Sequence, residues 1–328
     1  MSRSPRRVRR GLAVVAALLF AVPAWYLAVR ILSPWNAVKV IELEGDLAVV
    51  SSGAGSLRVG CFNIAHGRGG RADVSNWSDE TSGVRAERLL ALAAQIRRHN
   101  LDVVVLNECD FDCNWSHRVD QARVIAEAAG YPFVVEQRNY DFAVPFFSWR
   151  FGNAVLSRVP IADAELIRFK PKSRWEAVMS GNHDGLLCRL EMPDCNEVAV
   201  FAVHLESRPP EEIRALAVDR LLEIERALEF PLIAAGDFNS SPVGFPLSMR
   251  AADGRNAMDV ALGSGRFHSA TSAAPDSELF TFPSAAPDRK LDWILTSSGL
   301  EIRSVEVVDS DLSDHLLVWG EIWRLTGD

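Results

Sequence analysis

A carboxylate and a carboxamide stand two residues apart where an apolar run in the second half of the chain ends. The run Leu232–Ala235 leads into Gly236, Asp237, Phe238 and Asn239 within the stretch LIAAGDFNSSP. Side chains alternate across a strand, so Asp237 and Asn239 point the same way while Phe238 points into the core. Gly, Asp, Asn, Ser and Pro are also common in turns. Alone, this stretch is compatible with a polar site at a strand end and with an ordinary turn.

Polar groups of the same kinds mark the ends of other apolar runs. Asn63 follows RVGCF, Glu108 follows VVVLN and His204 follows VAVFAV. Glu and His are not typical turn residues, which favours one shared site over several separate turns. Such a cup of carboxylates, amides and imidazoles suits a hard cation such as Mg²⁺, which prefers oxygen ligands and keeps waters for reaction with phosphate. Its other members are Asp237, Asn239, Asp292 at the start of DWIL, and Asp314 and His315 of SDH.

Strands and helices alternate over residues 57–328, which predicts one α/β domain with a mixed sheet. Helices are expected where apolar residues recur with a period near 3.6, at Val84–Arg98, Val119–Ala129 and Glu212–Leu228. Strands are expected at the short apolar runs Leu57–Ile64, Leu101–Leu106, Tyr131–Val135, Ala154–Ser157, Gly185–Leu190, Val198–His204, Leu232–Ala235, Leu291–Leu295, Ile302–Val308 and Leu316–Ile322.

The N-terminal segment carries a cluster of positive charge in front of a long uncharged run. Ser2–Arg10 contains five Arg, and Gly11–Val29 follows as nineteen uncharged residues, about the span of a bilayer. Positive charge in front favours a cytoplasmic N-terminus and an exported body. Residues 1–32 are therefore predicted as an uncleaved membrane anchor, with a signal peptide cleaved near Val22-Pro23-Ala24 as the alternative. Residues 33–56 are predicted as a linker with a short hairpin, Val38–Leu43 and Leu47–Val50.

Composition describes a folded but acidic body. The chain of 328 residues is 48% hydrophobic and has a net charge of −8; residues 1–30 hold six Arg and no acid, which leaves a net charge of −14 on the rest. Such a body repels long polyanions unless it has a basic groove or recruits cations. If the body is exported, Cys188 with Cys195 and Cys109 with Cys113 are candidate disulfides, whereas Cys61 is predicted as a core thiol.

Seven motifs in a fixed order carry a resemblance to a known family. They are FNI, LNE, GNAVLSR, HLES, GDFNSSP, LDWIL and SDH, and with them the chain resembles the endonuclease/exonuclease/phosphatase superfamily over roughly residues 57–324. That superfamily includes deoxyribonucleases, abasic-site endonucleases, neutral sphingomyelinases, deadenylases and inositol-polyphosphate phosphatases. The resemblance implies a four-layer α/β sandwich of two packed mixed sheets flanked by helices, here a catalytic domain at residues 57–328 behind the N-terminal helix.

The resemblance also implies roles for the strand-end residues. Glu108 would bind Mg²⁺ or Mn²⁺, assisted by Asn63 and Asp314. Asp237 would orient or deprotonate the attacking water, and Asn239 would hold the scissile phosphate. His315, steered by Asp292, would act as general base or as a clamp on developing charge, and His204 would donate to a non-bridging phosphate oxygen. Phosphoryl transfer depends on charge neutralisation and positioning, which agrees with these roles.

Three further residues are candidate substrate contacts, and the sequence departs from the family pattern at Asn107 and in the loop AHGRGG. His66 and Arg68 lie in the loop AHGRGG after Asn63, and His183 precedes a strand. Asn107 stands where the family usually has Gln before the metal-binding Glu. The stretch Tyr140–Phe151, YDFAVPFFSWRF, is rich in aromatic residues. It is expected either to contact a membrane interface or to cross under the sheet as a buried segment.

These observations predict a metal-dependent phosphoester hydrolase with its catalytic domain exported to the periplasmic or extracellular side. It is anchored to the membrane, or secreted if the signal is cleaved. The preferred substrate class is lipid head groups or other small phosphodiesters, because of the anchor, the acidic body and the aromatic stretch. A nuclease acting on DNA or RNA and a non-catalytic binding module that keeps the fold are the alternatives. No obligate protein partner is inferred.

Overall fold

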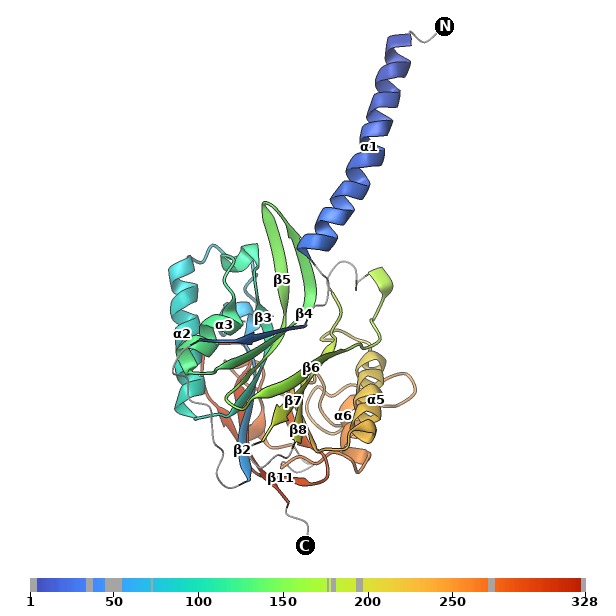
Figure 1. Ribbon diagram of the computed structural model, residues 1–328. Helices are drawn as coiled ribbons and strands as arrows, with labels where there is room; N and C mark the ends of the chain where they lie inside the picture. Colours follow the sequence, from blue (N-terminus) through green and yellow to red (C-terminus); the bar gives the residue numbers. More distant parts are fainter. Residues whose placement is uncertain are drawn as a thin grey trace.

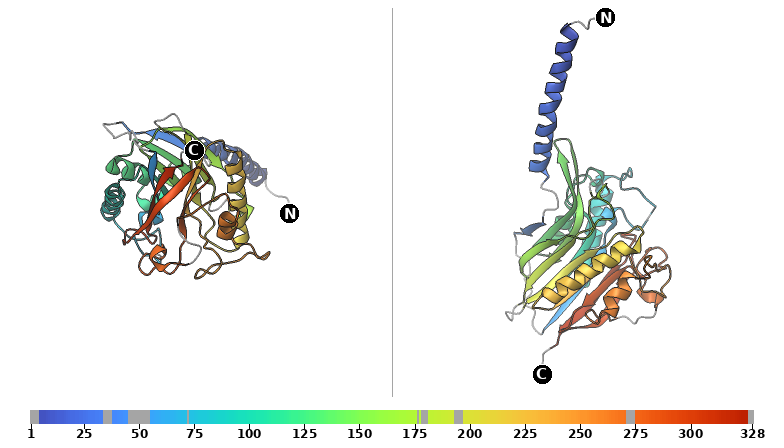
Figure 2. Two further views of the ribbon diagram at one scale, coloured as in Figure 1. Left: turned by 90° about the horizontal axis from the view of Figure 1, so that it is seen from below. Right: turned by 90° about the vertical axis from the view of Figure 1, so that its right-hand side faces the viewer.

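The computed structural model describes residues 5–33, 38–44, 55–71, 73–175, 177, 181–192, 197–270 and 275–325. Two β-sheets lie face to face, with helices on the outer side of each (Figures 1 and 2). One sheet has seven strands in the order β1-β4-β5-β3-β2-β12-β11, and the other has five in the order β10-β9-β8-β7-β6. The strands of the larger sheet are β1 (Val38–Glu42), β2 (Ser56–Asn63), β3 (Val103–Asp110), β4 (Phe133–Val144), β5 (Phe147–Ser157), β11 (Leu300–Val308) and β12 (Leu317–Arg324).

The smaller sheet and the helices complete the four layers. Its strands are β6 (Ile161–Ile167), β7 (Gly185–Glu191), β8 (Glu197–His204), β9 (Leu232–Asp237) and β10 (Asp292–Thr296). Helices α2 (Ser82–Arg98) and α3 (Gln121–Ala129) cover the larger sheet, and α5 (Glu211–Ala227) and α6 (Ala257–Gly263) cover the smaller one (Figure 1). The four-layer sandwich that the resemblance implies is confirmed, and the single mixed sheet expected from periodicity alone becomes two.

Strands buried on both faces explain why their sequences are uninterrupted apolar runs. In β3, Val103 and Val105 pack between the two sheets, while Val104 and Leu106 pack in the layer that contains α2 and α3. In the smaller sheet, Ala235 faces the layer between the sheets, and the preceding residue Ala234 packs under α5. Because both faces of these strands are desolvated, polar side chains are confined to the strand ends.

Most of the predicted strands and helices are present, and the differences concern edges and ends. Strand β6 and helix α6 were not predicted. The runs predicted at Tyr131–Val135 and Ala154–Ser157 extend through the aromatic stretch as the long β4–β5 hairpin, so a buried crossing segment is the wrong alternative. The predicted linker contains β1, which pairs with β4. The other strand of the predicted hairpin, Leu47–Val50, lies outside the described residues. The domain boundaries themselves stay a prediction.

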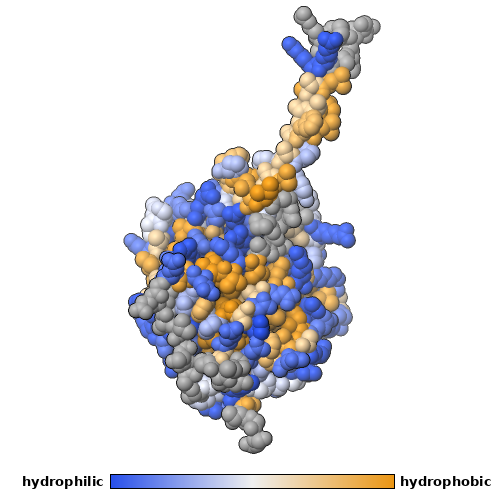
Figure 3. All heavy atoms as spheres, viewed as in Figure 1, coloured by the Kyte–Doolittle hydropathy of each residue, from blue (hydrophilic) through white to orange (hydrophobic). Residues whose placement is uncertain are grey.

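Helix α1 (Pro5–Leu32) projects from the body, and its exposed surface is apolar (Figures 1 and 3). Its segment Arg9–Val29 is long and apolar enough to cross a membrane, with a mean hydropathy of 2.3, and a signal helix meets the same criteria. Cys61, Cys109, Cys113 and Cys188 are free and buried. The predicted Cys109–Cys113 disulfide is therefore not formed, and Cys195 lies outside the described residues.

Candidate functional site

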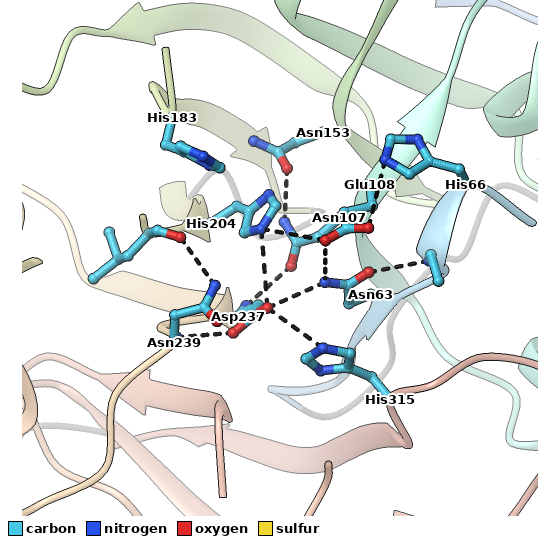
Figure 4. A network of polar contacts seen from close by, with 12 residues as sticks. Asn63, His66, Asn107, Glu108, Asn153, His183, His204, Asp237, Asn239 and His315 are labelled. Atoms are coloured by element: carbon cyan, nitrogen blue, oxygen red, sulfur yellow. Dashed lines mark hydrogen bonds and ion pairs between the residues drawn. The ribbon is translucent and has the colours of Figure 1, made fainter. Parts of the chain in front are cut away.

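Strand ends from both sheets meet at one end of the sandwich. The parallel strands β2 and β3 place Asn63 level with Asn107, and the parallel strands β8 and β9 place His204 level with Asp237. The antiparallel strand β10 begins beside the end of β9, where Asp292 pairs with Asp237. These register positions bring the predicted strand-end residues into one network of polar contacts (Figure 4).

His315 lies between two carboxylates. Its Nδ1 is 2.8 Å from Asp292 Oδ2, and its Nε2 is 3.7 Å from Asp237 Oδ2. Burial by itself would lower the pKa of His315, but the charges of Asp292 and Asp237 and the hydrogen bond to Asp292 overcome it and raise the pKa to about 10. Both ring nitrogens therefore face acceptors, an arrangement that favours the imidazolium.

Asn63 bridges the two central carboxylates. Its Nδ2 donates to Asp237 Oδ2 at 3.1 Å and to Glu108 Oε1 at 3.3 Å, while its Oδ1 accepts from the backbone N–H of Ala65 at 3.0 Å. The amide nitrogen, not the oxygen, thus faces the site. In this geometry Asn63 orients the carboxylates, and binding a metal through Oδ1 would require the bond to Ala65 to break.

Glu108 is the most accessible acid of the network, with a side chain 26% exposed. Its Oε2 is 3.5 Å from His66 Nε2, and its Oε1 is 3.9 Å from His204 Nε2. Burial would raise the pKa of Glu108, but nearby positive charge, first that of His66 and His204, outweighs it and lowers the pKa to about 2. Glu108 also adopts a left-handed backbone conformation, with φ at 49°. Strained conformations of this kind are more frequent at functional sites.

His204 is buried without hydrogen bonds. Neither of its ring nitrogens has a hydrogen-bond partner among the described residues, although Glu108 Oε1 and Asp237 Oδ2 each lie 3.9 Å from Nε2. Burial, reinforced by the neighbouring His183 ring at a centroid distance of 4.8 Å, lowers the pKa of His204 to about 3. A neutral imidazole with unused donor capacity is thus directed into the site, which agrees with the phosphate contact predicted for it.

Asn239 and Asp237 are held by short local contacts. The backbone N–H of Asn239 donates to Asp237 Oδ1 at 2.8 Å, and its side-chain Nδ2 donates to the carbonyl oxygen of Leu205 at 2.9 Å. Burial, opposed by the charge of His315, raises the pKa of Asp237 to about 7.

Asp314 is engaged by Arg68 rather than by the centre of the network. Arg68 Nη2 donates to Asp314 Oδ2 at 2.6 Å, so a predicted substrate contact and a predicted metal ligand form an ion pair. His66, the other loop candidate, is fixed by a 2.7 Å contact from its Nδ1 to Asp110 Oδ1, and Trp115 Nε1 donates to the other oxygen of Asp110 at 2.6 Å. Asp110 and Trp115 were not identified from the sequence.

A chain of amides also escaped sequence reasoning. The backbone N–H of Asp237 donates to Asn107 Oδ1 at 3.0 Å, and Asn107 Nδ2 donates to Asn153 Oδ1 at 2.9 Å. The chain continues from Asn153 to Gln137 at 2.7 Å and from Gln137 to Asn139 at 2.8 Å. The shorter amide at position 107 is therefore integrated into the network, and it connects Asp237 to β4 and β5.

A cavity of about 280 Å³ opens over the network. Its wall contains the candidate substrate contacts His66, Arg68 and His183, together with Glu108 and His204, whereas Asn239 is not among its lining residues. Residues of the β4–β5 hairpin, Asn139, Phe151 and Gly152, form another part of the wall. Charged and imidazole side chains therefore face one cavity, among them His66, Arg68, Glu108, His183 and His204.

The donor set fits a divalent cation. Glu108 is an ionised carboxylate that faces the cavity, and it is surrounded by groups that keep it charged. Asp237, Asp292 and His315 offer one ligand atom each within 4.8 Å of one another. His315 is already hydrogen-bonded to Asp292, so the group Asp237, Asp292 and His315 resembles a hydrogen-bonded chain that shares protons more than a set of metal ligands. We therefore regard Glu108 as the principal candidate ligand, because it is the ionised carboxylate that lines the open cavity.

Several solved structures share the fold of this chain. The endonuclease/exonuclease/phosphatase of Beutenbergia cavernae DSM 12333 is 22% identical, with a TM-score of 0.63 over 83% of this chain and 72% of that chain. The human Nocturnin catalytic domain with bound sulfate is 18% identical, with a TM-score of 0.59 over 88% and 97%. Mannosyl-6-phosphatase of Bacteroides thetaiotaomicron VPI-5482 is 15% identical, with a TM-score of 0.57 over 82% and 100%.

These structural likenesses show the fold alone, and no curated protein matches the chain. The sequence profile of the Endonuclease/Exonuclease/phosphatase family matches residues 60–315 and so includes every strand-end motif from Asn63 to His315. This match covers most of the chain, and the chain therefore belongs to the endonuclease/exonuclease/phosphatase family.

Proposed function

We propose that this chain is a divalent-metal-dependent phosphodiesterase that hydrolyses lipid head groups or other small phosphodiesters. Members of its family are usually phosphoester hydrolases and generally use a divalent metal. The observation that carries the proposal is the convergence of Glu108, His204, Asp237 and His315, with contacts of 3.7 to 3.9 Å between them. Glu108 and His204 of this group also line the cavity. The carboxylate of Glu108, the neutral donor His204 and the cationic His315 at such spacing match the charge neutralisation and positioning that phosphoryl transfer requires.

Glu108 is the proposed ligand of Mg²⁺ or Mn²⁺, and Asn63 and Asp314 are the proposed assisting groups; Asn63 presents its Nδ2 to Glu108, and Asp314 is paired with Arg68. A bound divalent cation would supply charge neutralisation for the phosphate oxygens. His204 donates a hydrogen bond to a non-bridging phosphate oxygen through its unpaired nitrogen. Asn239 contributes to holding the scissile group.

Asp237 is the proposed acceptor of the proton from the attacking water, and His315 is the proposed clamp. The two ring nitrogens of His315 face Asp292 and Asp237, so the ring has no free acceptor nitrogen for a water molecule. A cation held between two carboxylates can instead stabilise negative charge that develops on the phosphate.

The charges around the cavity support this substrate class. Two Arg line it, Arg68 and Arg208, and Arg68 is already paired with Asp314. A nuclease that tracks a long backbone needs a row of basic side chains. A cavity of about 280 Å³ with Glu108 and Glu206 in its wall suits a single phosphodiester with a small head group. The N-terminal helix and its Arg cluster support a membrane-anchored chain whose body faces the periplasmic or extracellular side.

The test uses the full chain in phosphatidylcholine proteoliposomes. Hydrolysis of bis(p-nitrophenyl) phosphate should require Mg²⁺ or Mn²⁺, stop on addition of EDTA, and be lost in Glu108→Gln. The matched control is Glu306→Gln, which changes an exposed carboxylate on β11. Hydrolysis that survives exhaustive chelation, or that is equal in the two variants, contradicts the metal role of Glu108.

A substrate panel separates the classes. Phosphatidylcholine, sphingomyelin, single-stranded DNA and RNA are each offered to the same preparation. Release of a phosphorylated head group from a lipid supports the proposal. Cleavage of nucleic acid with the lipids untouched supports the nuclease instead, and no hydrolysis of any ester supports a binding module that keeps the fold.

A further inference from the structure

The β4–β5 hairpin extends beyond the sandwich. Strands β4 and β5 pair in antiparallel register from Phe133–Ser157 to Val144–Phe147, so both run on far past the rest of the sheet. The hairpin rises from the sheet toward helix α1 (Figure 1), and the view turned by 90° shows the same neighbourhood (Figure 2). At its turn, Phe146 is 77% exposed.

One face of the hairpin is a continuous row of half-exposed aromatic rings. Phe147 lies 6.4 Å from Trp149, and Trp149 lies 6.3 Å from Phe151, measured between ring centroids. Phe151 is part of the cavity wall. The row therefore runs from the exposed turn to the site. Tyr140 and Phe142 pack on it from the other strand, and Trp77 stacks on Phe147 at 6.3 Å.

The hairpin is joined to the end of α1 by hydrogen bonds. Ser33, directly after the helix, bonds through its hydroxyl to the backbone of Ala143, and the guanidinium of Arg150 donates to the carbonyl oxygen of Leu32. The last turns of α1 expose Trp25 and Tyr26. Two exposed aromatic groups, one on the helix and one on the hairpin, thus lie where the apolar helix meets the body. Figure 3 shows apolar atoms at this junction and along α1.

We propose that the turn of the β4–β5 hairpin, with Phe146 at its tip, inserts into the lipid surface from which α1 emerges, and that it sets the distance between that surface and the cavity. Trp and Tyr favour the interface between hydrocarbon and water, and exposed aromatic surface is otherwise costly in water. The end of α1 fixes the level of that interface, and the hairpin lies at the same level.

Charges a few residues behind the turn of the hairpin, where Asp141 pairs with Arg150, limit the depth of insertion. Asp141 accepts from Arg150 Nε at 2.9 Å and from Arg138 Nη1 at 3.0 Å, and Arg150 Nη1 also lies 3.2 Å from Asp112. Moving these ion pairs into hydrocarbon would be unfavourable. The turn enters the interface while the ion pairs stay at the water side, and the aromatic row spans the space between the lipid and the cavity.

The test measures the position of residue 146 relative to lipid. Phe146→Cys in the full chain is labelled with an environment-sensitive fluorophore and reconstituted in phosphatidylcholine vesicles, with nitroxide-labelled phosphatidylcholine as the quencher. The expected result is a loss of fluorescence. Leu325→Cys is the matched control, because this residue is 53% exposed and lies near the C-terminus, at the end of the body far from α1 (Figures 1 and 2). The wild-type chain taken through the same labelling gives the background.

Equal quenching at positions 146 and 325 would overturn the proposal. So would protection of residue 146 from both the lipid nitroxide and aqueous iodide, which indicates a protein contact. Melting followed by circular dichroism verifies that both variants fold. The quenching result does not depend on hydrolysis, so it stands whatever becomes of the proposed function.

A second variant examines the consequence for the site. Phe146→Asp should lower hydrolysis of a vesicle lipid while hydrolysis of bis(p-nitrophenyl) phosphate stays unchanged. Equal loss on both substrates contradicts a role at the lipid surface. No activity on either substrate in the wild-type chain defeats the proposed function and leaves the quenching test valid.

Discussion

The bond between His315 and Asp292 can be tested by one isosteric substitution. Asp292→Asn keeps the size of the side chain and removes its charge. Asp292 is fully buried, its Oδ2 is 2.8 Å from His315 Nδ1, and its Oδ1 has no hydrogen-bond partner among the described residues. The new amide can therefore keep an oxygen toward His315 and direct its NH₂ to the unused side. What changes is the charge beside the imidazolium.

Two terms set the expected size of the effect. A hydrogen bond that involves an ionised group contributes about 1 to 2 kcal/mol more than a neutral one. The attraction between unit charges about 4 Å apart adds up to about 4 kcal/mol at a protein-like dielectric constant. Part of this attraction is already present in the ground state and does not affect kcat. A loss of about 3 kcal/mol in the transition state corresponds to a fall of roughly 100-fold in kcat. KM should stay unchanged, because Asp292 does not line the cavity.

The assay compares kcat and KM for bis(p-nitrophenyl) phosphate at fixed Mg²⁺ in Asp292→Asn and in Asp163→Asn. Asp163 is an exposed residue of β6, so its substitution makes the same chemical change at a solvent-exposed carboxylate on the other edge of the sheet. His315→Gln and the double variant complete a double-mutant cycle, in which the second substitution should add little to the first. A kcat of Asp292→Asn within about two-fold of the wild type, in a chain that melts normally, would refute the reasoning.

Three further substitutions test stability and the contacts around the site. Gly236→Ala should lower the free energy of unfolding by about 2 to 4 kcal/mol in denaturant, because Gly236 has φ of +137° and a Cβ would collide with the carbonyl oxygen of Val203. Gly263→Ala is the control, because a Cβ there meets no other atom, and an equal loss in both variants would contradict the steric argument. Burial and the charge of Glu136 raise the pKa of Asp120 to about 7, so the folded state holds this proton more tightly than the unfolded state does. The free energy of unfolding therefore falls as the pH rises from about 4 to 7. Asp120→Asn should raise the melting temperature at pH 8 and not at pH 4, and a gain independent of pH would disprove the linkage. Asn107→Ala leaves the buried N–H of Asp237 without its acceptor and should cost about 1 to 3 kcal/mol and lower kcat, whereas Asn107→Gln should retain more activity than Asn107→Ala.

The sequence was sufficient to locate the strand ends of the site because burial confines polar groups to them. His204 and Asp237 each end a strand whose apolar residues are buried on both faces, where a polar side chain can reach the site. Glu108 also follows an apolar run, but β3 continues past it to Asp110, and Glu108 lies at the register shift between Leu106 and Cys109. Their convergence then follows from parallel pairing of β2 with β3 and of β8 with β9. The family resemblance supplied the step that periodicity cannot, the division of the strands into two packed sheets.

The sequence was not sufficient to predict which groups bond to each other. Asn107 and Asn153 are joined by a 2.9 Å hydrogen bond although 46 residues separate them, and no spacing in the sequence encodes that contact. Arg68 and Asp314 are 246 residues apart in the sequence, so the ion pair between them could not be predicted, although it engages the carboxylate of a predicted metal ligand. The orientation of the Asn63 amide depends equally on a local bond to Ala65 that only the folded loop creates.

The β4–β5 hairpin shows why such long-range contacts bear on function. A bulge between Arg138 and Tyr140 interrupts its ladder, and Asn139, at that bulge, lies in the cavity wall. Asn139 also accepts from Gln137, the last donor of the amide chain that begins at the backbone of Asp237. Bulges redirect side chains and are frequent next to active sites. The same two strands thus carry an aromatic turn beside α1 and, further along, a hydrogen-bonded connection to Asp237 that passes through Asn107. On the proposed insertion, a lipid surface that fixes the turn also fixes the wall against which the phosphodiester is held.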